Sequence, residues 1–335
     1  MQKRRKFLKT MGLTTAAIGA MPYILKSEIS LPPAPGKRVG IIGLDTSHSI
    51  AFAKAMNAQD NADLRGYKVV AAYPYGSLDI ESSTSRIPGY IENVEAMGVE
   101  VVDSIEVLLE KVDVVLLETN DGRRHLEQVL PVLKAGKRVF VDKPVAASLE
   151  DTLKIYDASK EYGVPLFSSS SLRYITGAEV VQNGDLGKVL GATTWSPASL
   201  EKTHPDMYWY GIHGVEMLFT VMGTGCREVY RVHTDGADVI TGVWDEGQVG
   251  VFRGQRIGKL GYGGHVYGEK KSIELGPYRG YLPLLLDIIH YFETGEVPVT
   301  PEETIEIFAF MSAADESKKK GGKAVSLEKV LKKAR

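Results

Sequence analysis

The sequence predicts an α/β protein in which a doubly wound parallel sheet is followed by an α+β domain with a large, mostly antiparallel open sheet. Strand-like and helix-like segments alternate between Lys37 and Tyr162. The strand-like segments are apolar on both faces, which is typical of parallel strands covered by helices on both sides. Between residues 189 and 275, alternating segments with glycine-containing turns replace that pattern and indicate antiparallel strands.

The strands of the first sheet are predicted from short runs of β-branched and apolar residues. The run at Val39–Ile42 is followed by Gly43 at the strand exit and then by a helix start near Ser49. Such a strand, loop and helix are the first unit of a doubly wound sheet. The other strands of this sheet are predicted at Tyr67–Tyr73, Val114–Leu117 and Arg138–Val141.

Helices between these strands are predicted from their capping residues. Ser148 with Asp151 three residues later forms a capping-box start. Gly163 and Gly136 stand where a left-handed residue commonly ends a helix. The predicted helices cover Ile105–Glu110, His125–Ala135 and Leu149–Tyr162.

The pattern changes after Val164–Phe167, where the second domain is predicted to begin. Two helices, Leu282–Thr294 and Pro301–Lys318, are predicted to close this domain. The second of them starts with Thr300 as a hydroxyl cap, followed by proline and two glutamates. The predicted strands are Cys226–Val232, Val239–Trp244, Gln248–Arg253 and Lys271–Leu275.

Composition and charge limit the classes of function. A chain of 335 residues can bury a substantial core and divide into two domains. Its 40 basic and 42 acidic side chains give a net charge of −2, so no electrostatic footprint for nucleic acid is present. Cys226 is the single cysteine, which excludes an internal disulfide and a multi-cysteine zinc site. No metal site is predicted.

Residues 1–36 are predicted to be an export signal and a tether. The basic stretch Lys3–Lys9 precedes the apolar stretch Met11–Leu25, which is shorter than the about 20 residues of a membrane span. Arg4–Lys9 resembles the twin-arginine motif R-R-x-F-L-K. We therefore expect export by the twin-arginine route to the periplasm, with a membrane tether only where the signal stays uncleaved. A basic, frayed terminus is the alternative.

The loop after the first strand departs from the dinucleotide fingerprint. G-x-G-x-x-G would place glycines at 43, 45 and 48, whereas the chain has Gly43, Asp45 and His48. The second glycine normally lets the backbone approach the diphosphate, and the third permits close helix packing. A carboxylate at position 45 adds bulk and negative charge, unless it points away from the diphosphate.

Two further observations bear on a nucleotide. The acidic residue expected after the second strand, for the ribose hydroxyls, is absent, and Tyr73 stands there. The helix N-terminus with Thr46 and Ser47 can still donate hydrogen bonds to an anion. Nucleotide binding by that route is therefore retained as an expectation. A weaker alternative lets Asp45 and His48, with His125 or His213, ligate a metal or a polar substrate.

Several segments, in order and in spacing, resemble the Gfo/Idh/MocA family of sugar-type oxidoreductases. The resemblance covers roughly residues 37 to 330 and implies a Rossmann domain that carries a nicotinamide cofactor. It also implies a C-terminal domain whose open sheet often mediates oligomerisation. The segments are AGKRVFVDKP (135–144), GDLGKVLGA (184–192), GIHGVEMLFTVMG (211–223), VYGEKKSIEL (266–275) and PEETIEIFAFMSAADESKKKGGKAVSL (301–327).

Lys143 is the first predicted catalytic residue. It follows a predicted strand, at the edge where ligands collect in open α/β sheets. Pro144 favours an extended backbone at Lys143, which helps to aim the ammonium group. The family resemblance places it in a Glu-Lys-Pro motif, here with Asp142 in place of glutamate. A lysine beside a sugar hydroxyl can hold its oxygen or serve as a general acid or base. A solvated loop lysine is the alternative.

His213 is the second predicted catalytic residue, because a histidine can take the hydroxyl proton as hydride leaves the carbon. The family usually has an aspartate four residues earlier, where this chain has Trp209. Asp206 is the nearest carboxylate, and we expect it to substitute. A histidine satisfied within the core is the alternative.

The remaining site residues are predicted from the loop and from the resemblance. Substrate contacts are expected from Arg173, Tyr174, Tyr210 and His265. The predicted cofactor-binding residues are Gly43, Asp45, Thr46, Ser47, His48, Tyr73, Thr119, Asn120, His125, Asp142 and Lys143.

The sequence thus predicts three segments: a signal and tether (1–36), a Rossmann-type domain (37–164) and a substrate and oligomerisation domain (165–335). The predicted function is hydride transfer between a sugar or polyol carbon and a tightly held NAD or NADP, in a homo-oligomer. The alternative is a non-redox protein on the same fold: a sugar-binding module, or a lyase or hydrolase that uses Lys143 and His213 as acid and base. A purely structural partner protein would give Lys143 no role.

Overall fold

The computed structural model describes residues 36–59 and 62–335, and residues 34–335 form one compact unit. Most of the predicted export signal and tether, residues 1–35, lies outside the described residues. Across the described part of the chain, no helix has both the length and the apolar character that a membrane crossing requires.

The first sheet has six parallel strands in the order β3-β2-β1-β4-β5-β6. The order reverses between β1 and β4, so the predicted doubly wound sheet is confirmed, with its switch point beside β1. The strands are β1 (Arg38–Ile42), β2 (Lys68–Tyr73), β3 (Glu100–Val101), β4 (Val114–Leu117), β5 (Val139–Val141) and β6 (Leu166–Phe167). The helices between them are α1 (Ser47–Asn57), α2 (Glu81–Thr84), α3 (Ile87–Ala96), α4 (Ile105–Lys111), α5 (His125–Lys134) and α6 (Leu149–Tyr162).

The capping residues predicted from the sequence make the expected hydrogen bonds. Ser148 Oγ accepts a hydrogen bond from Asp151 N at 3.0 Å at the start of α6, and Gly163 ends this helix with φ +66°. Gly43 has φ +90°, and a Cβ there would lie 2.6 Å from the Thr119 backbone. Only glycine therefore fits where β1 leaves the sheet beside β4.

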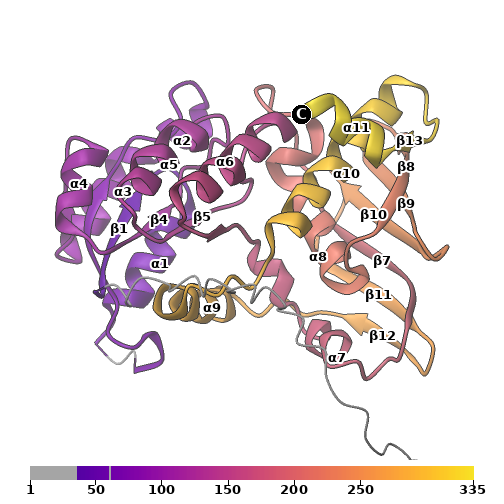
Figure 1. Ribbon diagram of the computed structural model, residues 1–335, viewed down its shortest axis with the longest axis horizontal. Coiled ribbons are helices and arrows are strands. Elements are labelled where there is room, and N and C mark those ends of the chain that lie inside the picture. Colours follow the sequence, from indigo (N-terminus) through magenta and orange to yellow (C-terminus); the bar gives the residue numbers. More distant parts are fainter. Residues whose placement is uncertain (1–35, 60–61) are drawn as a thin grey trace, which may run out of the picture. The chain divides into compact units, whose positions relative to one another are not determined.

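The second sheet has seven strands in the order β12-β11-β7-β10-β9-β8-β13. The pair β7 and β10 is parallel and the other pairs are antiparallel, as predicted for a mostly antiparallel sheet. Helices α8 (Ile212–Met222) and α10 (Pro301–Lys319) pack on one face (Figure 1). The strands are β7 (Val189–Pro197), β8 (Cys226–His233), β9 (Ala237–Trp244), β10 (Val249–Gln255), β11 (Gly263–Gly268), β12 (Ser272–Leu275) and β13 (Val325–Ser326). Short helix α7 (Ala178–Gln182) precedes this sheet, and α11 (Leu327–Ala334) follows it.

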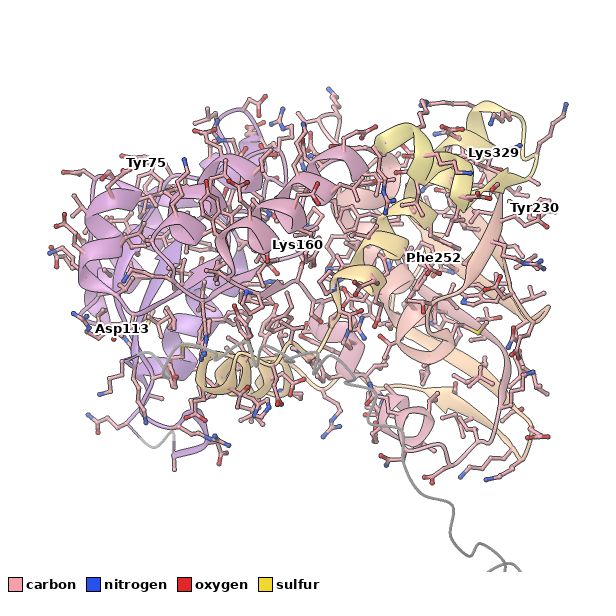
Figure 2. All side chains as sticks on the ribbon, in the orientation of Figure 1. Tyr75, Asp113, Lys160, Tyr230, Phe252 and Lys329 are labelled. Atoms are coloured by element: carbon pink, nitrogen blue, oxygen red, sulfur yellow. The ribbon has the colours of Figure 1, made fainter. Side chains whose placement is uncertain are left out.

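The two faces of the second sheet differ in exposure. Phe252 of β10 is buried against Gly214 of α8, where a Cβ would clash with the phenyl ring. Tyr230 of β8 is exposed on the other side (Figure 2). Outward-pointing apolar side chains also occur on β10 and β11, at Val249 and Tyr267. One face is therefore covered by helices and the other is open.

Helix α9 (Leu282–Thr294) corrects one expectation. It was predicted to close the second domain, but its apolar side packs in the same core cluster as β1 and α1 (Figure 1). Arg138 donates to the Phe292 carbonyl, and the Tyr291 hydroxyl accepts a hydrogen bond from Val139 N at 3.2 Å. The chain therefore returns to the first sheet after building most of the second.

Candidate functional site

A cavity of about 390 Å³ lies at the switch point of the first sheet. Its walls come from the loops after β1, β4 and β5, from the turn leading into α8, and from the segment around residues 262–281. Ligands commonly bind at the carboxyl ends of strands at such a switch point. The lining residues are Thr46, Ser47, His48, Ser82, Arg86, Asn120, Lys143, Ser171, Leu172, Ser199, Trp209, Tyr210, His213, Tyr262, Tyr278 and Tyr281.

Lys143 reaches the cavity from the end of β5 and is 5% exposed. Its Nζ lies 3.9 Å from Asp142 Oδ2, and both side chains are buried. Burial opposes ionisation of Asp142, but the neighbouring His48 and Lys143 lower its pKa to about 2. The charged carboxylate thus fixes the lysine ammonium at the cavity.

His213, near the start of α8, lines the same cavity as Lys143. Its Nδ1 shares a 2.6 Å hydrogen bond with Ser170 Oγ, which leaves Nε2 as the ring nitrogen for a ligand. Burial and the charges of Lys143 and His48 hold the pKa of His213 well below its usual range. The imidazole is therefore neutral near pH 7 and can accept a proton.

Glu216 holds the segment that carries Ser170. Its carboxylate accepts hydrogen bonds from Ser169 Oγ and Ser170 N, both at 2.8 Å, and from Arg173 Nε at 3.0 Å. Because Glu216 lies one helical turn after His213, a single helix supplies the imidazole and the carboxylate that positions its hydroxyl partner.

Tyrosines form the wall opposite the first sheet. The hydroxyls of Tyr210 and Tyr262 are 2.7 Å apart, and that of Tyr278 lies 2.9 Å from Ser171 Oγ. Tyr281 packs edge-on against the His48 ring, with 4.9 Å between centroids. This combination of hydroxyls and aromatic rings suits a polyhydroxylated ligand.

Asp45 does not face the N-terminus of α1. Its buried carboxylate accepts hydrogen bonds from Ser77 N at 2.8 Å and Asn120 N at 2.9 Å. Gly76 approaches this carboxylate so closely that no Cβ would fit. Asp45 therefore ties the loop after β2 to the loop after β4.

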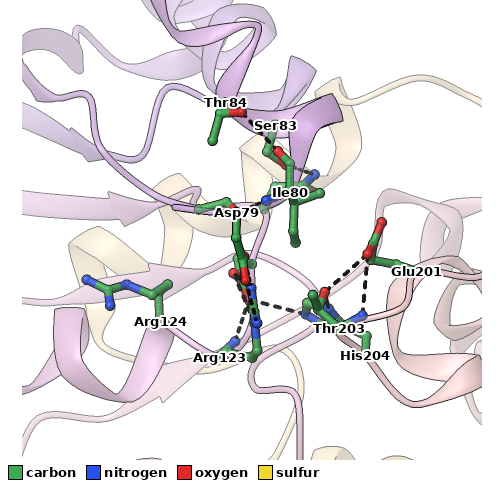
Figure 3. Close-up of polar contacts among 12 residues, drawn as sticks. Asp79, Ile80, Ser83, Thr84, Arg123, Arg124, Glu201, Thr203 and His204 are labelled. Atoms are coloured by element: carbon green, nitrogen blue, oxygen red, sulfur yellow. Dashed lines mark hydrogen bonds and ion pairs between the residues drawn. The ribbon is translucent and has the colours of Figure 1, made fainter.

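A second set of polar contacts closes the same region (Figure 3). Arg123, after β4, pairs with Asp79, after β2, and with Asp121 at 2.7 Å. His204 Nε2, from the segment before α8, lies 3.4 Å from Asp121 Oδ1. The segment containing α2 is thus fixed to the loop after β4.

These contacts test the fit of a dinucleotide. Thr46, Ser47, Asn120 and Lys143 border the cavity at the start of α1, where a diphosphate and a nicotinamide would lie in this fold. On the adenosine side, Tyr73 stands in place of the ribose-binding acid, and the Asp45 carboxylate joins the loops after β2 and β4. The residues therefore fit the nicotinamide half better than the adenosine half.

Several predicted cofactor residues lie outside the cavity. Thr119 Oγ1 donates to Gln128 Oε1 at 2.6 Å, and the Thr119 carbonyl is 2.6 Å from His125 Nε2. His125 is fully buried between this carbonyl and that of Val145. Tyr73 packs against Tyr75, with 5.7 Å between ring centroids. These residues shape the loop after β4 and the end of β2.

Asp206, predicted to assist His213, is instead part of an ion-pair cluster with Arg231 of β8 and Lys318 of α10. Its Oδ2 lies 2.5 Å from Arg231 and 2.7 Å from Lys318. A π-helical turn over Met207–Gly211 separates it from α8, so the regular helical spacing assumed between Asp206 and His213 does not hold.

Three of the predicted substrate contacts also lie elsewhere. Arg173 is buried between Glu216 and Glu303, and Tyr174 donates to Asp287 Oδ2 at 2.6 Å. His265 stands on the open face of β11, because Val266 takes the buried place in the alternation. Tyr210 does line the cavity.

The sequence reasoning missed Glu118, Ser170, Glu216, Tyr278 and Tyr281. Glu118 has a local signal, because it is a charged residue directly after the apolar strand β4. The two tyrosines occur in GPYRGY, a glycine-rich loop that gives no indication of its spatial neighbours.

We expect Asp45→Ala to lower the free energy of unfolding by about 2–5 kcal/mol, because it leaves the buried amides of Ser77 and Asn120 without an acceptor. Urea unfolding measures this change. Asp157→Ala, at an exposed position of α6, should stay within about 0.5 kcal/mol of wild type. An equal loss in both variants would contradict the bridge.

Acidification should destabilise the protein partly through His213. Its pKa is lowered in the folded state, so below about pH 6.5 the unfolded chain binds a proton that the folded chain does not, and stability falls by up to about 1.4 kcal/mol per pH unit. His213→Asn should show a shallower decline of unfolding free energy between about pH 6.5 and pH 5.5. His290→Asn, at an exposed site, should retain the wild-type slope.

Comparison with known proteins gives one family match and several relatives. Residues 37–170 match the Gfo/Idh/MocA family, described as an oxidoreductase family with an NAD-binding Rossmann fold. Myo-inositol 2-dehydrogenase of Thermotoga maritima is 28% identical over 267 residues, which cover 70% of this chain and 74% of that protein. An uncharacterized oxidoreductase of Streptococcus pneumoniae and inositol 2-dehydrogenase 3 of Saccharopolyspora erythraea are each 30% identical, over 32% and 43% of their length.

Solved structures with the same fold cover most of the chain. A "probable dehydrogenase" of T. maritima has a TM-score of 0.73 at 24% identity and covers 88% of this chain and 99% of its own. The scyllo-inositol dehydrogenase of Lactobacillus casei, solved with NAD(H) and scyllo-inositol, has a TM-score of 0.70 at 15% identity, with 87% and 99% covered. At these identities the structures establish the fold.

Proposed function

We propose, from the match of residues 37–170 to the Gfo/Idh/MocA family with its NAD-binding Rossmann fold, that this protein oxidises or reduces a sugar or polyol with a nicotinamide cofactor. The observation that carries the proposal is that Lys143, from the loop after β5, and His213, from helix α8, line one cavity at the switch point. The two groups supply a cation and a neutral base, which oxidation of a secondary alcohol requires.

The substrate class follows from the cavity and from the relatives. The lining offers serine and tyrosine hydroxyls with few apolar side chains, so a ligand must present many hydrogen-bonding groups. Relatives named as inositol dehydrogenases act on cyclic polyols of this kind. We therefore place a cyclic sugar or an inositol in the cavity.

In the proposed oxidation, the Lys143 ammonium holds the oxygen of the reacting hydroxyl and His213 Nε2 accepts its proton. Ser170, fixed by Glu216, keeps the imidazole in place. The C–H bond breaks as hydride leaves, and the carbinol becomes a carbonyl. A bound nicotinamide would accept that hydride. The residues that would hold the cofactor are Thr46, Ser47, Asn120 and Lys143.

A non-redox function is the second candidate, favoured by the Asp45 carboxylate, which joins the loops after β2 and β4 on the adenosine side of a dinucleotide. In that case Lys143 and His213 would act as acid and base in a lyase or hydrolase, or would only bind the sugar. A folded protein that keeps this cavity but binds no nucleotide would favour this candidate over the first.

Location and assembly are part of the proposal. The twin-arginine-like stretch at Arg4–Lys9 supports export of the folded protein, and a cofactor would then be loaded before export and stay bound. The open face of the second sheet, with exposed Tyr230, Val232, Val249 and Tyr267, supports association of several copies.

Nucleotide content tests the proposal. Protein purified under native conditions is denatured, and the released small molecules are identified by mass spectrometry; the refolded or nucleotide-free protein is then titrated with NAD and NADP. We expect one of these nucleotides to be released or to bind, and inositol to be oxidised with it. Absence of both release and binding would leave only the non-redox candidate.

A further inference from the structure

We propose that His48, Glu118 and Asp142 form a binding site for one divalent metal ion behind the cavity wall. The three residues come from the start of α1 and from the ends of β4 and β5, the elements that meet at the switch point. One ligand atom from each lies within 4.8 Å of the others. Among the described residues, no second group of three such side chains meets this spacing.

Three of the four carboxylate oxygens of this group have no hydrogen-bond partner. Glu118 and Asp142 are completely buried. Both oxygens of Glu118 and Oδ1 of Asp142 lack a partner, whereas Asp142 Oδ2 is 2.8 Å from His48 Nδ1. Buried polar atoms without partners are rare and costly, and an unseen ion or water is a usual explanation. A cation would be a partner for one oxygen of each carboxylate.

The local charge favours a cation over water. Two buried carboxyl groups lie together, and Lys143 is the cation beside them, 3.9 Å from Asp142. A divalent ion bound between them would neutralise both carboxylates.

The donor set indicates the class of metal. One imidazole nitrogen with carboxylate oxygens suits borderline ions such as Zn²⁺ and Mn²⁺, whereas Ca²⁺ needs about six to eight oxygens. Metal–ligand distances of about 2.0–2.2 Å place neighbouring ligand atoms about 3–4 Å apart, which is within the 4.8 Å limit on the separations in this cluster. The inference does not rest on the proposed redox function, because the three side chains need no nucleotide to ligate a metal.

Metal binding can be measured on the full chain. Protein freed of metal with a chelator is equilibrated by dialysis against ZnCl₂ or MnCl₂, and its metal content is determined by elemental analysis. We expect one equivalent in the wild type and an affinity at least about tenfold lower in Glu118→Gln, because loss of even an outer partner of a metal site costs 10–100-fold. The control is Asp121→Asn, which removes another buried carboxylate beside a histidine. This variant should still bind one equivalent of metal.

Two results would overturn the site: a wild type that binds neither ion, or a Glu118→Gln protein that binds as the wild type does. Should Glu118→Gln fail to fold, the wild type still decides, because a bound ion must raise its melting temperature with ion concentration. Nucleotide release is measured separately, so failure of the metal site and failure of the redox function remain distinguishable.

Discussion

Replacing Lys143 with methionine should lower turnover by about 10²- to 10⁴-fold, the usual contribution of a positioned acid or base. The ammonium group lies at the cavity beside Asp142, and methionine retains its bulk without its charge or donors. We expect the loss chiefly in kcat, since the alcohol oxygen gains negative charge in the transition state. The measurement is steady-state formation of reduced nicotinamide with the inositol or sugar substrate of the proposed reaction.

Lys137→Met is the matched control for this variant. The Lys137 ammonium donates to the Val112 carbonyl at 2.8 Å and does not line the cavity, so turnover should stay at the wild-type level. Circular dichroism and thermal unfolding would show that both variants fold. Full activity in Lys143→Met would remove this residue from the mechanism, whether or not the protein releases or binds a nucleotide.

Replacing Arg231 with methionine should lower the free energy of unfolding by about 3–5 kcal/mol, as expected when one partner of a buried ion cluster is removed. The guanidinium is fully buried and contacts Asp206, Asp238 and Asp315 at 2.5–2.7 Å. Burial already raises the pKa of Asp315 to about 6, even with the arginine present. Loss of this cation leaves carboxylates that must be protonated or hydrated. Equilibrium unfolding in urea measures the change.

Arg227→Met tests whether burial causes that loss. Arg227 pairs with Asp245 at 3.5 Å, but both side chains are more than half exposed, so the pair should contribute about 0–1 kcal/mol. A similar loss in both variants would mean that the three carboxylates do not depend on Arg231. It would also reopen a role for Asp206 outside this cluster.

Elements fixed by neighbours in the chain could be predicted closely. Helix α6 has the predicted bounds because Ser148 caps Asp151 N and Gly163 supplies the left-handed residue. The strands around β4 could be recognised because burial on both faces requires continuous apolar runs. Lys143 and Tyr210 were placed at the site by motif and position, and both line the cavity.

Long-range placement could not be predicted in the same way. The apolar side of α9 indicates burial, but nothing in its sequence selects the first sheet over the second. Asp206 and His213 are near in sequence, yet a π-helical turn directs the carboxylate to Arg231. The bridge from Asp45 to Ser77 and Asn120 joins three separate loops, and only their meeting shows which way the carboxylate points.

By itself, the sequence determined the two kinds of sheet, the helix ends and the lysine at the end of β5, because these depend on hydrogen bonds and burial patterns within a few residues. Only the tertiary structure decided that His213 lines the same cavity as Lys143, that Asp45 turns away from α1, and that Glu118 lies beside Asp142 and His48. The physical reason is that these contacts depend on how strand ends and loops pack across the switch point. The residues that meet there are held by side-chain interactions with distant parts of the chain.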